Sequence, residues 1–157
     1  MTKSENLELM IDSLNLPNFR GRELTPYWSR TRGGVKNSIP PEALWMNIIP
    51  TLVVLQEFRT QYGSPISLIG TYRSPEYNRA VGGAGGSLHM QFLVIDFQCE
   101  EGTAMEWARL LRSFRGQRFQ ISGMHGKFTF TGGIGTYRAD NFVHIDCRTK
   151  NQNWDER

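Results

Sequence analysis

Apolar residues recur at helical spacing in three segments of the chain. The longest is residues 40–63, which begins with two prolines and ends at a glycine, and its spacing predicts a helical region. Pro50 is expected to kink or divide this region, because proline removes a helical hydrogen bond. Residues 103–115 predict the clearest amphipathic helix, with Thr103 as its cap, and a short helix is expected around residues 7–14.

Short apolar runs and period-two alternation predict strands between these helices. Residues 66–72 alternate and end in a loop, and the run at residues 92–95 predicts a strand buried on both faces that holds Asp96. Residues 119–137 alternate apolar pairs with glycines, a pattern typical of hairpins and tight turns. Residues 141–148 predict a final strand. Helices and strands in this arrangement indicate an α+β fold.

Length and composition narrow the class of protein. The chain has 157 residues, enough for a single domain with a proper core, and 39% of them are hydrophobic. No apolar run approaches the length that spans a bilayer. The N-terminus has acidic residues and no uninterrupted apolar stretch, so no signal peptide is expected. The chain is therefore expected to be synthesised in the cytoplasm. The net charge of +3 suits an anionic partner, although so small an excess is ordinary for a solvated surface.

Residues 1–39 are expected to form an N-terminal arm ahead of the main domain. Within the arm, residues 20–36 interleave arginines with Tyr27 and Trp28. Such a composition can contact phosphates or stack on bases, but the segment has no nucleic-acid-binding motif. The favoured interpretation is an arm that wraps the domain with its aromatic residues packed inward.

Two cysteines, Cys99 and Cys147, each end an apolar strand. They are too few for a disulfide framework, and buried free thiols are the expected state. The alternative is that the two strand ends lie side by side and pair in an oxidising compartment.

The segment Ser87–Asp96, read SLHMQFLVID, carries the chemistry that suggests a function. Zinc binds imidazole nitrogen and carboxylate oxygen, and a catalytic zinc uses three protein ligands with one open position. His89 and Asp96 are candidates for two ligands, and the glycine-rich run at residues 82–86 can turn the chain so that they meet. His144 in FVHID is the candidate for the third ligand. A lone histidine is more often a structural residue, so the prediction depends on all three.

Other polar residues are candidates for roles around such a metal. Arg73 follows a strand and could bind a carboxylate or stabilise an oxyanion. Period two places Asp146 on the same strand face as His144, where it could act as a general base or orient the histidine. Asp140 is a second candidate base, but it lies in a turn where aspartate is common. His125 is either a substrate contact or an exposed loop residue, and the loop interpretation is favoured.

Four motifs together carry a family resemblance. In this order, GTYRSPEYNRAVGG, SLHMQFLVID, GGIGTY and FVHIDCR resemble the zinc D-alanyl-D-alanine carboxypeptidase family of peptidoglycan peptidases. The vancomycin-resistance D,D-dipeptidases, phage endolysin peptidases and the hedgehog signalling domain share that fold. The similarity runs from about Pro40 to Trp154 and includes the family's Ser-x-His start as Ser87 and His89.

The resemblance implies a single α+β domain over residues 40–157, with a mainly antiparallel sheet and flanking helices. It also implies one zinc ion held by His89, Asp96 and His144, with Arg73 steadying the substrate or transition state. Ser87 is placed to support a ligand or contact the substrate.

The chain departs from the family pattern at three positions. Leu88 stands where a polar Gln is frequent, and Phe92 stands where many members have glycine. Dipeptidase-like members carry an acid three residues before the last histidine, whereas this chain has Asn141, which cannot accept a proton. Asp146 is therefore the better candidate for the base or for the residue that orients the histidine.

Three classes of function fit these observations. The first is a zinc peptidase that hydrolyses bonds involving D-amino acids in peptidoglycan stem peptides, as a carboxypeptidase or as a cross-link endopeptidase. The second is a non-catalytic zinc-containing binding module, which the loss of an acid at Asn141 favours. The third is a structural or nucleic-acid-contacting protein that uses the basic arm. The peptidase is preferred. Its expected partner is peptidoglycan or its precursor peptides, and no nucleic acid is expected. The chain is expected to be a monomer and to act on the cell wall if it is released or exported.

Overall fold

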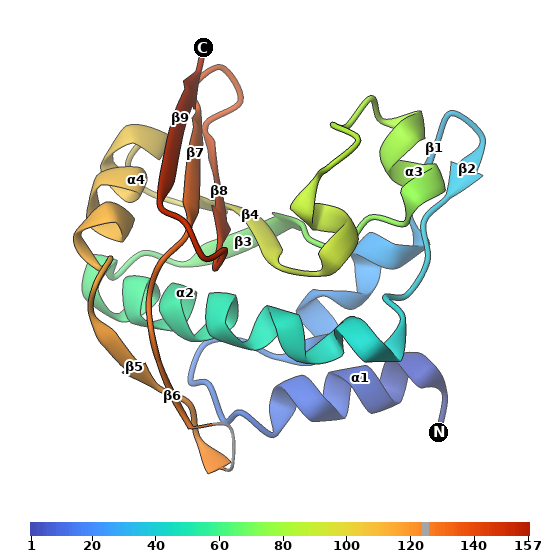
Figure 1. Ribbon diagram of the computed structural model, residues 1–157, viewed down its shortest axis with the longest axis horizontal. Helices are drawn as coiled ribbons and strands as arrows, with labels where there is room; N and C mark the ends of the chain where they lie inside the picture. The colour runs from blue at the N-terminus through green and yellow to red at the C-terminus, as the bar shows by residue number, and fades with distance from the viewer. Residues whose placement is uncertain (124–125) are drawn as a thin grey trace.

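A computed structural model describes residues 1–123 and 126–157 and is organised around a mixed five-stranded sheet (Figure 1). In sheet order the strands are β3 (Ile66–Gly70), β4 (Val94–Cys99), β8 (Phe142–Asp146), β7 (Gly133–Tyr137) and β9 (Gln152–Glu156). Neighbours pair antiparallel except β7 and β9, which are parallel. The α+β fold with a mainly antiparallel sheet is thereby confirmed.

Helix α2 (Ile48–Tyr62) lies against the sheet, and most of its residues are buried. The region expected to be kinked or divided at Pro50 is divided, but ahead of that residue: a 3-10 helix, η3 (Glu42–Asn47), precedes α2, and Pro50 falls in the first turn of α2. A proline is tolerated there because the first N–H groups of a helix have no partner within it. Gly63 ends α2 with φ +82°, a left-handed conformation that glycine adopts without strain.

The N-terminal segment supplies a further layer beneath α2 (Figure 1). Helix α1 (Lys3–Asp12) has a capping box at Thr2, and its buried Leu7 and Ile11 join the same hydrophobic core as α2. Two 3-10 helices follow, η1 (Gly21–Glu23) and η2 (Thr25–Ser29), and then the two-residue strands β1 (Thr31–Arg32) and β2 (Val35–Lys36). The aromatic residues of η2, Tyr27 and Trp28, are buried, which is the inward packing expected of the arm. The division of the chain at residue 39 stays a prediction.

Helix α4 (Ala104–Ser113) covers the sheet near β7 and is the amphipathic helix that the sequence predicts. The Thr103 hydroxyl accepts a hydrogen bond from the Glu106 amide, and Trp107, Ala108 and Leu111 face the core. The remaining elements are α3 (Pro75–Ala80), the 3-10 helix η4 (Leu88–Gln91) and a hairpin of β5 (Arg118–Gln120) and β6 (Lys127–Thr129). Within the described residues, no helix has the length and hydropathy needed to cross a membrane.

The topology rules out the alternative in which Cys99 and Cys147 pair. Both are free thiols. Cys99 is the last residue of β4 and Cys147 directly follows β8, but the two strands are antiparallel: Cys99 lies beyond the Phe97–Val143 pair, and Cys147 lies beyond the Val94–Asp146 pair at the other end. About six residues of strand, roughly 20 Å, separate them, whereas a disulfide needs Cα atoms closer than about 7 Å. Burial raises the pKa of both thiols to about 12.

Candidate metal centre

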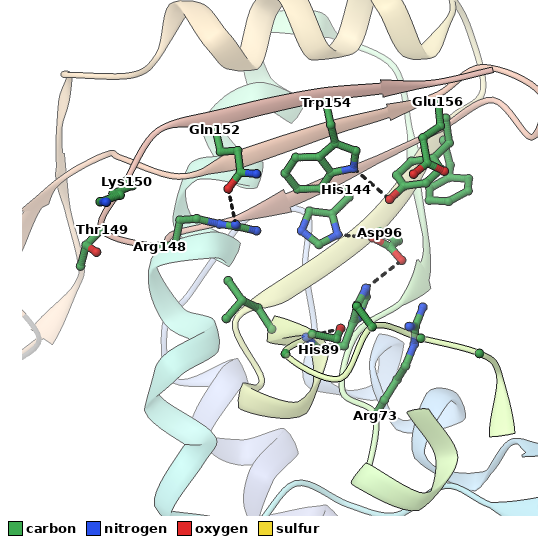
Figure 2. A pocket seen from close by; sticks show the side chains of 18 residues that line it. Arg73, His89, Asp96, His144, Arg148, Thr149, Lys150, Gln152, Trp154 and Glu156 are labelled. Atoms are coloured by element: carbon green, nitrogen blue, oxygen red, sulfur yellow. Dashed lines mark hydrogen bonds and ion pairs between the residues drawn. The ribbon is translucent and has the colours of Figure 1, made fainter. Parts of the chain in front are cut away.

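Three elements bring His89, Asp96 and His144 together. Asp96 on β4 and His144 on β8 are direct partners across the antiparallel ladder, so their side chains leave the same face of the sheet. His89 comes from η4, the turn that enters β4. One ligand atom from each residue lies within 4.8 Å of the other two, and all three residues are buried. In Figure 2 the two imidazoles approach the Asp96 carboxylate from different sides.

His89 is held by the backbone. Its Nδ1 lies 2.5 Å from the carbonyl oxygen of Thr71, at the end of β3. Because a carbonyl only accepts, this contact places a proton on Nδ1, and Nε2 is the ring nitrogen directed at Asp96, 3.2 Å from Oδ2. The Ser87 hydroxyl accepts from the His89 amide at 3.3 Å and so caps the turn. Ser87 therefore supports a predicted ligand.

His144 is held by side chains. Its Nε2 lies 2.8 Å from Asp146 Oδ2, and its Nδ1 lies 3.3 Å from Asp96 Oδ1. The Asp146 carboxylate is fully buried and receives two hydrogen bonds from the Arg148 guanidinium, at 2.8 and 2.6 Å, and one from the Gly133 amide at 3.1 Å. Asp146 thus lies on the side of the imidazole away from Asp96.

The electrostatics keep both carboxylates ionised. Burial by itself would raise the pKa of Asp96, but His89 and His144 outweigh it and hold that pKa well below its ordinary range. For Asp146 the same burial is outweighed by the hydrogen bonds from Arg148 and His144, and its pKa is likewise lowered. Burial would lower the pKa of His144, but the two aspartates raise it overall.

These residues fit a metal ion. Asp96 Oδ1 is buried without a hydrogen-bond partner among the described residues, which is costly unless an ion or water satisfies it. Two imidazole nitrogens and a carboxylate are the donor set that Zn²⁺ takes in catalytic sites with an open fourth position. Each histidine also has a partner for its other ring nitrogen, as metal-binding histidines almost always do.

A cavity of about 750 Å³ opens onto this group. Its wall on one side is strand β9, whose Gln152, Trp154 and Glu156 alternate along the strand and line the cavity. The Trp154 ring packs 4.8 Å from the His144 ring, and its Nε1 donates to the Tyr137 hydroxyl at 2.9 Å (Figure 2). A side chain at Gly135 would collide with Trp154, so glycine there lets the indole reach the metal centre.

A comparison with protein-family models matches residues 17–146 to the family described as Peptidase M15. That range is more than half of the 157-residue chain. The chain belongs to the peptidase M15 family. M15 peptidases are zinc-dependent metallopeptidases, and the match confirms the resemblance to zinc D-alanyl-D-alanine carboxypeptidases that the four motifs carry. No curated protein matches the chain.

In this M15 family member, the two predicted bases do not reach the cavity. Asp146 is enclosed behind His144, a position suited to orienting the imidazole and not to taking a proton from a ligand in the cavity. Asp140 is exposed on the turn between β7 and β8 and lines neither of the two larger cavities. This geometry favours the orienting role for Asp146, one of its two expected roles, and the assignment of either aspartate as a proton acceptor stays a prediction.

The other predicted residues fall in three places. Arg73 is half-buried, lines the cavity and makes one long hydrogen bond, 3.4 Å, to Asn78. Asn141 points away from the metal centre: its Oδ1 accepts from the Ala104 amide at 2.8 Å and so caps α4. Ser87 lines the cavity as well as capping η4. His125 lies outside the described residues.

Sequence reasoning missed the groups on β9 and the partners of the histidines. Trp154 and Glu156 lie beyond the expected last strand, although the alternation Gln152, Trp154, Glu156 was a usable signal. Arg148 belongs to the FVHIDCR motif, but the motif does not indicate that its guanidinium pairs with Asp146. The Thr71 carbonyl could not be found from residue types, because any residue offers the same group.

Proposed function

We propose that the protein is a zinc peptidase that hydrolyses peptide bonds involving D-amino acids in peptidoglycan stem peptides. The observation that supports this proposal is the buried His89–Asp96–His144 group, in which Asp96 Oδ1 lacks a hydrogen bond, facing a cavity large enough for a peptide segment. Zinc bound there would lower the pKa of its water and polarise a substrate carbonyl. Membership of the M15 family supports the reaction class.

The remaining residues of the cavity have distinct roles in this proposal. Arg73 keeps free donors toward the cavity and is suited to a substrate carboxylate or a developing oxyanion. The Tyr137 hydroxyl accepts from Trp154, so its own proton is available to the substrate. Burial raises the pKa of Tyr137, which keeps the hydroxyl protonated near neutral pH. Both groups would stabilise negative charge as the carbonyl is attacked.

Glu156 is the proposed proton acceptor. Apart from Asp96, it is the only carboxylate among the described residues that line this cavity. It is exposed, at the end of β9, so its carboxylate is free to move toward the substrate. A carboxylate in this place can take the proton released in hydrolysis and transfer it to the leaving amine. Replacement by glutamine removes the acceptor with little change in shape.

The test is incubation of the zinc-loaded protein with purified peptidoglycan and with synthetic stem peptides, followed by mass analysis of the products. Loss of terminal D-alanine would identify a carboxypeptidase, and opened cross-links an endopeptidase. A chelator should abolish product formation and added zinc should restore it. Glu156→Gln should lower the rate by about 100-fold or more while leaving the zinc content unchanged.

A non-catalytic binding module on the same fold is the second candidate. The observation that favours it is that Asn141 is committed to capping α4 and Asp146 to orienting His144, so neither offers a base. This candidate predicts zinc and peptide binding without product, in wild type and Glu156→Gln alike.

A further inference from the structure

A second cavity of about 500 Å³ adjoins the metal centre. The two cavities share the wall residues Arg73, Gly82, Gly83, Asp96 and Phe142. A ligand that extends from the metal centre past Arg73 therefore enters the second cavity. The M15 match covers this region, and the wall of the second cavity includes residues of the N-terminal arm, none of which lines the first cavity.

The second cavity is basic. Arg30 and Arg32 from the arm and Arg73 from the β3–α3 loop line it, and its only carboxylate among the described residues is the metal-centre Asp96. In the described part of the chain none of these three arginines forms a salt bridge; the ion pairs there involve other residues. Three guanidinium groups around one concavity leave an excess of positive charge that an anionic ligand would neutralise.

Arg30 and the loop that carries Arg73 are positioned before any ligand arrives. Arg30 Nη1 donates to the Ile69 carbonyl at 3.0 Å, and its guanidinium lies 4.3 Å over the Tyr27 ring. Buried Asn37 fixes the arm to the loop that carries Arg73: its Nδ2 donates to the carbonyls of Tyr27 and Tyr72, each at 2.9 Å, and its Oδ1 accepts from the Ser74 amide. The arm and Arg73 are thus held as one unit, which lowers the entropy cost of binding.

We propose that this second cavity is a subsite for a carboxylate of the substrate, on the peptide one or more residues from the cleaved bond. The inference rests on the proposed peptidase function and adds to it that the preferred substrate is an acidic peptide. The shared wall at Arg73 and Asp96 favours a peptide that continues from the metal centre. Nucleic acid is disfavoured because three of the cavity's four aromatic residues, Tyr27, Tyr72 and Tyr77, are buried, and the ring of the fourth, Phe142, is already stacked on Tyr137.

The experiment compares pairs of synthetic stem peptides in which one member carries a free carboxylate and the other carries a carboxamide at the same position. The pairs cover the positions on both sides of the cleaved bond. With the zinc-loaded full chain, one position should show kcat/KM about 10- to 100-fold higher for the carboxylate, the effect of a hydrogen-bonded ion pair. The variant is Arg32→Gln, because Arg32 is exposed and its side chain forms no hydrogen bond or ion pair with the other described residues. Arg109→Gln, exposed on α4, makes the same change of net charge and is the matched control.

In Arg32→Gln the preference for the carboxylate peptide should fall several-fold, and in the double variant Arg30→Gln/Arg32→Gln to about threefold or less. In Arg109→Gln it should match the wild type. An unchanged preference in the double variant, or the same loss in Arg109→Gln, would overturn the proposal. Equilibrium binding of the same peptides distinguishes failure of the peptidase function from failure of the subsite. If no hydrolysis occurs, the subsite is still supported when the carboxylate peptide binds more tightly than the carboxamide peptide and Arg32→Gln weakens that binding. Equal binding of both peptides contradicts the subsite.

Discussion

The two histidines of the metal centre are supported in opposite ways. His89 is oriented by one backbone carbonyl, that of Thr71, and sits on a 3-10 turn. His144 is oriented by a buried charge network of Asp146 and Arg148 and is packed against Trp154. A backbone contact survives most substitutions, whereas a side-chain network can be removed by one. The His144 side should therefore be the more sensitive half of the site.

The largest effect is expected where the two halves meet. Asp96 faces both histidines, and Asp96→Asn removes the only charge that the two ligands share. Zinc should be lost on dialysis, and hydrolysis should fall by at least about 1,000-fold, because a bound metal supplies several kcal/mol of transition-state stabilisation. Metal analysis and initial rates check this. Retained zinc with normal rates would show that the metal lies elsewhere.

The next largest effect is expected from Asp146→Asn. The change leaves Arg148 partly buried without its counter-charge and should lower the free energy of unfolding by about 3–5 kcal/mol. It should also weaken zinc binding by about 10- to 100-fold, since the His144 tautomer is no longer fixed. Asp155→Asn is the matched control, because it breaks an exposed ion pair with Arg138 and should cost less than about 1 kcal/mol. Similar losses in both variants would contradict the comparison.

The pH dependence of stability follows from the same aspartate. The pKa of Asp146 is lower in the folded protein than in the unfolded chain. Its stabilisation is therefore fully present above the unfolded pKa, about 3.9, and is lost as the pH falls below that value toward the folded pKa. Denaturant titrations of the zinc-free protein should show similar slopes in wild type and Asp146→Asn above about pH 5, and a steeper loss of stability in wild type below about pH 4.

A smaller effect is expected from Gly135→Ala. The added Cβ would collide with the Trp154 indole, so the ring must move off His144. Overpacking of this kind typically costs about 1–3 kcal/mol. Denaturant unfolding gives the cost, and near-ultraviolet circular dichroism reports the tryptophan environment. A variant that matches wild type in both measurements would show that the contact between Trp154 and His144 does not depend on this glycine.

The smallest effect is expected on the other half of the site. Thr71→Val removes the hydroxyl that donates to the Val94 carbonyl at 2.9 Å, at a cost of about 1 kcal/mol, but keeps the carbonyl that holds His89. Zinc affinity should change less than about twofold. A loss as large as that in Asp146→Asn would show that the two histidines are supported alike.

The helices, the buried strand of Asp96 and the three predicted metal ligands follow from local pattern, because periodicity and motif spacing are properties of contiguous residues. Period two correctly placed Asp146 on the face of His144, but it does not say on which side of the imidazole the carboxylate lies. That required the positions of Arg148 and Gly133, which come from other parts of the chain.

Two departures from the family pattern acquire a physical reason only in three dimensions. Phe92 and Asn141 both have positive φ, +55° and +51°, a conformation that explains why glycine suits the first position. Phe92 is nonetheless buried, packed edge-on against Trp28 and Tyr72, so core packing offsets the backbone strain. Strand β9 was missed because its residues are mostly polar and its parallel pairing with β7 is non-local.

The central claim is that His89, Asp96 and His144 hold one zinc ion with an open position. X-ray absorption spectroscopy of the zinc-loaded protein, with metal analysis of the same sample, tests it directly. We predict one zinc per chain with two imidazole ligands and only nitrogen and oxygen donors at about 2.0–2.2 Å. A sulfur ligand near 2.3 Å, a stoichiometry well below one, or an unchanged spectrum in His144→Ala would contradict the account.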